Sequence, residues 1–202
     1  VIGEAQDWDL IICGTYQMPD ILTPVAEEHP ERNFMIFDAT IDYSKGQHKN
    51  IYSVTYKQNE ASYLAGVMAQ GMVKAGAIPS AQGTVLGFLG GLDIPVINDF
   101  LVGYTAGAES VDPAAKIAVS YAGSFSDAAK GKELALAQYR SGAGIGFNVA
   151  GQTGLGQLAA AKDMGRLAIG VDSDQEAIFR KTDPATADKV GTSGLKRIDV
   201  TL

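Results

Sequence analysis

The sequence predicts an α/β protein with parallel sheets, and three features support that fold class. Short apolar segments of strand length alternate with segments of helical period along most of the chain. The 24 glycines among 202 residues exceed the roughly 7% of average usage, and many follow the apolar segments, where strand-to-helix loops need them. Residues 144–156 have the pattern of a strand and a glycine-rich loop, followed by a helix and a second strand at 168–171. Ligands of open α/β sheets bind beyond the carboxyl ends of the strands, so this stretch also indicates where a binding site belongs.

Length and composition limit the class of protein further. A chain of 202 residues forms one large domain or two small ones, and a hydrophobic content of 46% is enough for a proper core. The net charge of −7 argues against nucleic acid or an anionic membrane as partner, because no segment supplies a basic face. No run approaches the ~20 apolar residues of a membrane span. No signal peptide is recognisable, so an exported protein would be represented here in mature or trimmed form.

Cysteine and histidine usage predicts neither a disulfide framework nor a metal site. Cys13 is the single cysteine and lies in an apolar run, which favours a buried and inert thiol. The two histidines, His29 and His48, lack the spacing of zinc ligands, and their polar neighbours place them on the surface. We therefore expect no metal and no cofactor.

The first part of the chain predicts three strands and two helices. The strands are expected at 10–15, 34–37 and 51–57. One helix opens at Pro19 and ends before Pro30, and the other is capped by Asn59. A Gly/Pro/Ser segment at 75–83 interrupts the pattern and predicts a crossover between two lobes.

The alternation then restarts. Strands are expected at 85–89 and 117–121, with helices capped by Asp93 and by Ser126 or Asp127. The glycine-rich unit follows, and a segment at 190–198 is expected to be a strand or a second crossover.

Carboxylates directly follow several apolar strands. Asp38, Asp172 and Asp174 occupy such positions, where ionised carboxylates can accept hydrogen bonds from the paired hydroxyls of a sugar. The alternative for each of them singly is a cap on the following helix or turn. Their repeated placement favours ligand binding.

Two aromatic residues and one cation are further candidates. Phe125 and Tyr16 each follow a strand, where an aromatic ring can stack on a flat ligand or fold back onto the core, and the second alternative is stronger for Tyr16. Lys196 is able to bond a ligand hydroxyl or a carboxylate, but a solvated surface lysine fits the sequence equally well.

The glycine-rich loop does not match a nucleotide-binding motif. Its glycines at 151, 154 and 156 depart from the order of dinucleotide sites, and no P-loop lysine follows. The loop offers either helix N-terminal N–H groups to a ligand or tight strand–helix packing. Residues 122–126 lack the second glycine of a nucleophile elbow, so an enzyme is not expected.

Several of these motifs together resemble one family. The resemblance covers nearly the whole chain and is carried by residues 59–66, 87–97, 121–132, 150–156, 169–175 and 193–199. In these segments the chain is similar to the basic membrane protein family, the substrate-binding lipoproteins of bacterial ABC importers typified by purine nucleoside receptors.

The resemblance implies a type I periplasmic-binding-protein fold, with two Rossmann-like lobes that close on a nucleoside. Carried over by position, Asp38, Asp172 and Lys196 would hold the ribose, Phe125 would stack on the base, and Gly151 would contribute backbone contacts. Asp174 is a weaker candidate. The first βαβ unit of the family pattern has no counterpart before Val1, so the expected domains are an incomplete N-terminal lobe at 1–79, a C-terminal lobe at 80–190 and a crossover back at 191–202.

The resemblance also implies the setting in which the protein works. We expect an extracytoplasmic, non-enzymatic receptor, lipid-anchored or periplasmic, that delivers a nucleoside, with a purine favoured, to a membrane permease. The alternatives are a ligand-sensing regulator of the same fold and a sugar or vitamin receptor. An enzyme acting on nucleosides is disfavoured because no nucleophile or positioned base is evident.

Overall fold

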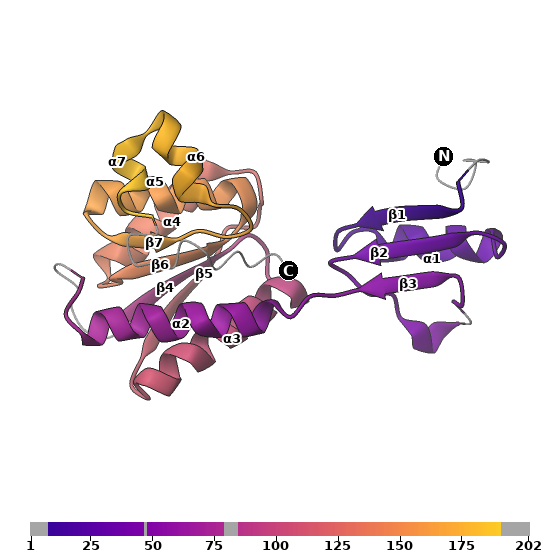
Figure 1. Cartoon of the computed structure of the whole chain (residues 1–202), viewed down its shortest axis with the longest axis horizontal. Helices are drawn as coiled ribbons and strands as arrows, with labels where there is room; N and C mark the ends of the chain where they lie inside the picture. The colour runs from indigo at the N-terminus through magenta and orange to yellow at the C-terminus, as the bar shows by residue number, and fades with distance from the viewer. Residues whose placement is uncertain (1–7, 47, 79–84, 191–202) are drawn as a thin grey trace. The chain divides into compact units, whose positions relative to one another are not determined.

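The computed structural model describes residues 8–46, 48–78 and 85–190. The chain divides into two compact units, and the division falls between Tyr56 and Lys57. Both units are α/β structures with parallel strands, as Figure 1 shows. They are described separately below.

Unit 1 is a three-stranded parallel sheet with a helix on one face. Strands β1 (Leu10–Gly14), β2 (Asn33–Phe37) and β3 (Ile51–Val54) lie in the order β1-β2-β3. Helix α1 (Pro19–Glu28) connects β1 to β2, and a short 3₁₀ helix, η1 (Tyr43–Lys45), precedes β3. The buried core consists of Leu22, Ala26, Phe34, Ile36, Ile41 and Ile51.

The two faces of the unit 1 sheet differ in their covering. Side chains alternate across a strand, so Phe34 and Ile36 lie buried on the helix side, whereas Phe37 is exposed. On the face away from α1, Ile12 is 58% and Tyr52 54% exposed. Parallel sheets are generally covered on both faces. The exposure of apolar side chains on this face, in the part of unit 1 that the structure describes, is therefore unusual.

Unit 2 is a three-layer α/β/α structure. Its four-stranded parallel sheet has the order β5-β4-β6-β7. Helices α2 and α3 cover one face of the sheet, and α4 and α5 cover the other (Figure 1). The elements are α2 (Gln58–Lys74), β4 (Val85–Gly90), α3 (Pro95–Val111), β5 (Lys116–Tyr121), α4 (Ala128–Arg140), β6 (Ile145–Val149), η2 (Gly151–Thr153), α5 (Gly154–Met164), β7 (Leu167–Ile169), α6 (Gln175–Thr182) and α7 (Pro184–Ala187).

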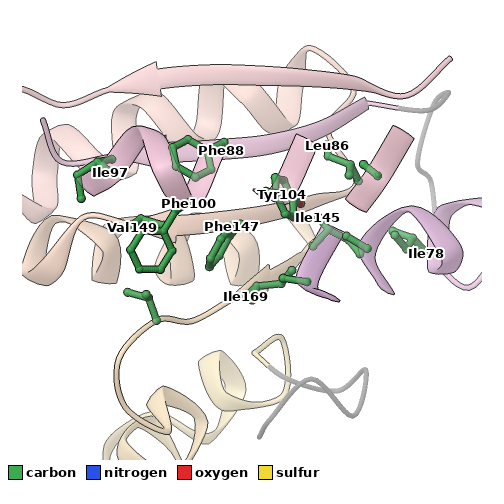
Figure 2. Packing of buried hydrophobic residues seen from close by; sticks show 14 residues of the cluster. Ile78, Leu86, Phe88, Ile97, Phe100, Tyr104, Ile145, Phe147, Val149 and Ile169 are labelled. Carbon is green, nitrogen blue, oxygen red and sulfur yellow. The ribbon is translucent and has the colours of Figure 1, made fainter. Parts of the chain in front are cut away.

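The main core of unit 2 lies between the sheet and helices α2 and α3. Phe88 from β4 and Phe147 from β6 pack edge to face, with ring centroids 5.9 Å apart. Tyr104 of α3 packs on Phe147 at 5.2 Å (Figure 2). These aromatic contacts fix the central strands, and with them the loops that leave their carboxyl ends.

The boundary of the units differs from the sequence prediction. The sequence indicated a lobe boundary at residue 79, whereas α2 belongs to the compact unit that starts at Lys57. The reason is the close packing of α2 on α3, where Gly66, Gly103 and Gly107 let the two backbones approach. The predicted crossover at 75–83 lies largely outside the described residues, as does the segment 190–198 beyond Val190.

Several local predictions were wrong. Asn59 is not the N-cap of α2, since that helix starts at Gln58, and Asp93 does not cap α3, whose N-cap is Ile94. Strand β3 ends at Val54, short of the predicted residue 57. His48 is 6% exposed instead of lying on the surface, because it packs against Gly46 and beside Glu27.

Candidate functional site

The candidate site of unit 2 lies at the carboxyl edge of its sheet. All four strands are parallel, so their carboxyl ends lie along the same edge. The loops that leave this edge carry Phe125 after β5, Gly151 after β6, and Asp172 and Asp174 after β7. The topology thus gathers four of the residues predicted from sequence.

Phe125 and Gly151 are in direct contact. A Cβ atom at Gly151 would lie 3.5 Å from the Phe125 Cβ and 3.1 Å from its carbonyl oxygen. Gly151 has a φ of +55°, which a glycine adopts without steric cost. The ring of Phe125 is half-buried and packs against the main core, which is the second of the two alternatives that the sequence left open.

Gly91 is part of the same contact and was not identified from the sequence. A Cβ atom at Gly91 would lie 2.3 Å from two ring carbons of Phe125, so only glycine leaves room for the ring there. The Gly90–Gly91 pair that ends β4 was the available signal. Gly91 also accepts a hydrogen bond from the Ser124 N–H at 3.0 Å, which ties the two loops together.

Asp172 and Asp174 have different surroundings, although both follow β7. Asp174 is the N-cap of α6, and its carboxylate accepts from the Ala177 N–H at 3.0 Å, as the capping alternative predicts. Asp172 is exposed and has a φ of +65°. The turn that leads to it is held by the buried Gln175, whose Oε1 accepts from the Val171 N–H at 3.3 Å.

In unit 1, Asp38 and Tyr16 also lie at strand carboxyl ends. Asp38 follows β2, is exposed, and donates its N–H to the Val54 carbonyl at 3.1 Å. Tyr16 is 40% exposed and comes two residues after the end of β1. Each of these residues therefore reaches the surface at the carboxyl edge of its own sheet.

Backbone strain marks the same strand ends. In the described chain, the non-glycine residues with positive φ are Thr15 (+89°), Asp38 (+56°) and Asp172 (+65°). Each follows a parallel strand by one to three residues. Such conformations cost about 1–3 kcal/mol and are concentrated at binding and active sites. Two of the three residues are carboxylates that the sequence indicated.

A polar chain begins close to the same edge of unit 2. The Tyr121 hydroxyl donates to Oδ1 of Asn98, and Asn98 Nδ2 donates to Asp93 at 2.7 Å. Burial raises the pKa of the Tyr121 hydroxyl, and the nearby Asp93 carboxylate raises it further. Tyr121 is therefore a neutral donor near physiological pH, and it fixes the first turn of α3 to the end of β5.

The remaining candidates contribute less. Lys196 lies outside the described residues. Cys13 is a half-buried free thiol whose pKa is raised by burial. Among the described residues, no group of three or more acidic, histidine or cysteine side chains is arranged to hold a metal ion. None of the described helices has the length and apolar character that crossing a bilayer requires.

Comparison with known proteins gives one family. Residues 4–201 match the family model described as "Bmp: ABC transporter substrate-binding protein PnrA-like". The ABC transporter nucleoside-binding protein BmpA of Lactococcus lactis subsp. cremoris is 37% identical over 97% of this chain and 55% of its own length. An uncharacterized lipoprotein of Pyrococcus abyssi is 29% identical over 98% of this chain and 48% of its own length.

Solved structures agree on the fold. A solute-binding protein of an ABC transporter system from Aeropyrum pernix K1 has a TM-score of 0.78 at 24% identity, covering 91% of this chain and 53% of that one. The predicted fold class, an α/β protein of the type I periplasmic-binding-protein kind, is confirmed. The chain spans about half the length of the relatives it matches.

Proposed function

The chain belongs to the Bmp family of ABC transporter substrate-binding proteins, the PnrA-like group, and on that premise we propose that it binds a nucleoside for an ABC importer. The family consists of substrate-binding proteins and not of enzymes. Purine nucleosides are the favoured ligands.

The observation that carries the proposal is the arrangement around Phe125. A half-buried aromatic ring lies against two glycines at the carboxyl edge of a parallel sheet. A ring held in this way is suited to stack on a flat base, and base–aromatic stacking contributes about 1–3 kcal/mol. The relative BmpA, which is named as nucleoside-binding, supports the same ligand class.

The proposed roles follow from the chemistry of each group. Phe125 stacks on the base, and the backbone of Gly151 lies beside that ring. Asp172 accepts hydrogen bonds from ribose hydroxyls, because an ionised carboxylate offers two acceptor oxygens to a diol. We assign Asp172 the main role and Asp174 a minor one, since Asp174 already caps α6.

Asp38, Tyr16 and Lys196 complete the proposal. Asp38 is an exposed carboxylate on a strained backbone, which suits a second ribose contact. Tyr16 is assigned a weaker contact through its exposed ring. Lys196 is assigned to the ribose on the family resemblance alone.

The family and its named members also suggest where the protein works. We propose an extracytoplasmic receptor that passes its ligand to a membrane permease. The relative named as a lipoprotein supports a lipid anchor as the means of attachment.

Asp172→Asn tests the ligand and the site together. Asparagine tolerates the left-handed backbone that Asp172 adopts, so the variant removes the charge without adding strain. Hydrogen bonds to charged groups contribute about 1.5–3 kcal/mol each, so we expect the affinity for inosine or adenosine to fall by at least about tenfold. Isothermal titration calorimetry on the complete natural polypeptide measures this change.

The matched control removes one carboxylate elsewhere. Asp163→Asn changes the net charge equally, and Asp163 lies near the C-terminal end of α5, whereas the N-terminal end of that helix follows the β6 loop. Its affinity should equal that of the wild type. Equal affinities for Asp172→Asn and the wild type would reject the site assignment. Tight binding of free ribose or another sugar, with no binding of nucleosides, would reject the ligand class.

A further inference from the structure

Two loops at the carboxyl edge of unit 2 are joined through Thr153. The Thr153 hydroxyl donates to the Ser124 carbonyl at 2.9 Å and accepts from the Asp127 N–H at 2.9 Å. The Thr153 N–H donates to the Phe125 carbonyl at 3.2 Å. Three hydrogen bonds from one residue of the β6–α5 loop therefore reach three positions of the β5–α4 loop, on both sides of the Phe125 side chain.

The side chain of Thr153 is completely buried. Its exposed fraction is 0%, and burying a hydroxyl at such a position costs free energy of desolvation unless the hydroxyl is hydrogen-bonded. In its two hydrogen bonds, the Thr153 hydroxyl acts once as a donor and once as an acceptor. The backbone of Thr153 also packs closely on α4, because a Cβ atom at Gly131 would lie 2.0 Å from the Thr153 carbonyl oxygen.

Both ends of the β5–α4 loop are anchored in further structure. Ser124 donates its N–H to Gly91 at 3.0 Å, and the Asp127 side chain caps α4 by accepting from the Lys130 N–H at 2.9 Å. Thr153 bonds to both Ser124 and Asp127, so it closes the loop between two fixed points. The segment between them carries the Phe125 ring.

We propose that Thr153 is the positioning residue that holds Phe125 ready for the base of the ligand. The inference rests on the proposed function, and it adds a residue that does not touch the ligand and acts through Phe125. A ring that is ordered before binding loses less conformational freedom when the ligand arrives, and this increases affinity without adding a contact.

A double-mutant cycle separates this role from a general structural one. Thr153→Val keeps the shape of the side chain and removes the hydroxyl, whereas Thr153→Ser keeps the hydroxyl. We expect the valine variant to bind a purine nucleoside about tenfold more weakly and the serine variant to remain within about threefold of the wild type. In a Phe125→Ala background, Thr153→Val should change the affinity by less than about twofold.

Two results of the cycle would overturn the proposal. One is an affinity of Thr153→Val equal to that of the wild type. The other is a loss on Thr153→Val that is as large in the Phe125→Ala background as in the wild type, because Thr153 would then act independently of Phe125. If the valine variant does not fold, Thr153→Ala replaces it, since alanine removes the hydroxyl without placing a methyl group among backbone polar atoms.

Amide hydrogen exchange tests, in the absence of ligand, whether Thr153 holds the β5–α4 loop. In Thr153→Val the Asp127 N–H loses its acceptor, and its exchange should be about tenfold faster than in the wild type and in Thr153→Ser. Failure of the wild type to bind any nucleoside would reject the proposed function, and the exchange rates would still decide whether Thr153 holds the loop. Equal exchange rates of the Asp127 N–H in the wild type, Thr153→Val and Thr153→Ser would show that the Thr153 hydroxyl does not hold the β5–α4 loop.

Discussion

At the scale of single residues, backbone strain occurs at the ends of three strands. Thr15, Asp38 and Asp172 adopt left-handed conformations at strand ends. Asp tolerates this conformation better than most residues, whereas a β-branched threonine at φ +89° is a clear outlier. The sequence indicated Tyr16 at the end of β1, but the strain lies on its neighbour Thr15, so Thr15 is the residue there whose conformation calls for an explanation.

Asp183 gives a prediction about pH. Hydrogen bonds from Lys162 and then Thr186 lower the pKa of the Asp183 carboxyl from 3.8 to about 2. A carboxyl with a lowered folded-state pKa stabilises the fold above its unfolded pKa, and this contribution is lost as pH falls from about 4 toward 2. We expect Asp183→Asn, which can still cap α7, to lower stability at pH 7 and to match the wild type increasingly closely as pH falls.

Chemical denaturation at a series of pH values measures the Asp183 effect. Lys162→Gln is the matched variant, because Lys162 Nζ lies 2.7 Å from Asp183 Oδ2 and its removal should reduce the same pH-dependent difference. A stability difference between Asp183→Asn and the wild type that is the same at pH 7 and pH 2 would contradict this explanation.

At the scale of elements, glycines set the distance between α2 and α3. A Cβ atom at Gly103 would lie 2.1 Å from the Asn59 carbonyl oxygen, and one at Gly107 would lie 2.0 Å from that of Tyr63. Gly71, which lies in α2, has no such neighbour within 4 Å, whereas Gly103 and Gly107 belong to α3. Two glycines therefore serve close backbone packing, while the third does not.

Alanine substitutions at these positions should have opposite effects. Gly71→Ala should stabilise the protein by roughly 1 kcal/mol, because alanine has the higher helix propensity. Gly103→Ala makes the same gain but forces the helices apart, and overpacking of this kind costs about 1–3 kcal/mol or more. Urea unfolding measures both. Equal effects of the two substitutions would mean that α2 and α3 do not pack as closely as described.

Sequence periodicity predicted most elements because each strand and helix has a local signal. The residues that position the Phe125 ring were harder to predict. Gly91 and Thr153 act on a loop that is 28 to 34 residues away in the chain, and no local pattern indicates which loop a glycine or a hydroxyl will contact. The prediction that His48 lies on the surface was wrong for the same reason, since its burial comes from contacts with Gly46 and with Glu27 on another element.

At the scale of the whole molecule, the chain divides into two compact units at a position that differs from the lobe boundary expected at residue 79. The Gly/Pro/Ser segment at 75–83 is the stronger break in composition, and it indicated the change of lobe. The connection after β3 has no comparable signal, because Tyr56 and Lys57 are followed at once by a helix. Helix–helix packing, which is a long-range property, decides that α2 belongs to unit 2.

The two units should differ in stability. Among the residues that the structure describes, the unit 1 core holds six buried apolar residues under helix α1, whereas unit 2 has clusters of fourteen and eight. Small cores bury too little apolar area to offset much conformational entropy. We therefore expect hydrogen exchange with mass spectrometry to show peptides from β1 to β3 losing protection at lower urea concentrations than peptides from β4 to β7. Ile36→Ala, at a fully buried position of β2, should shift only the first transition, and Gly71→Ala only the second. One shared transition that both variants shift equally would show instead that the chain unfolds as a single cooperative structure.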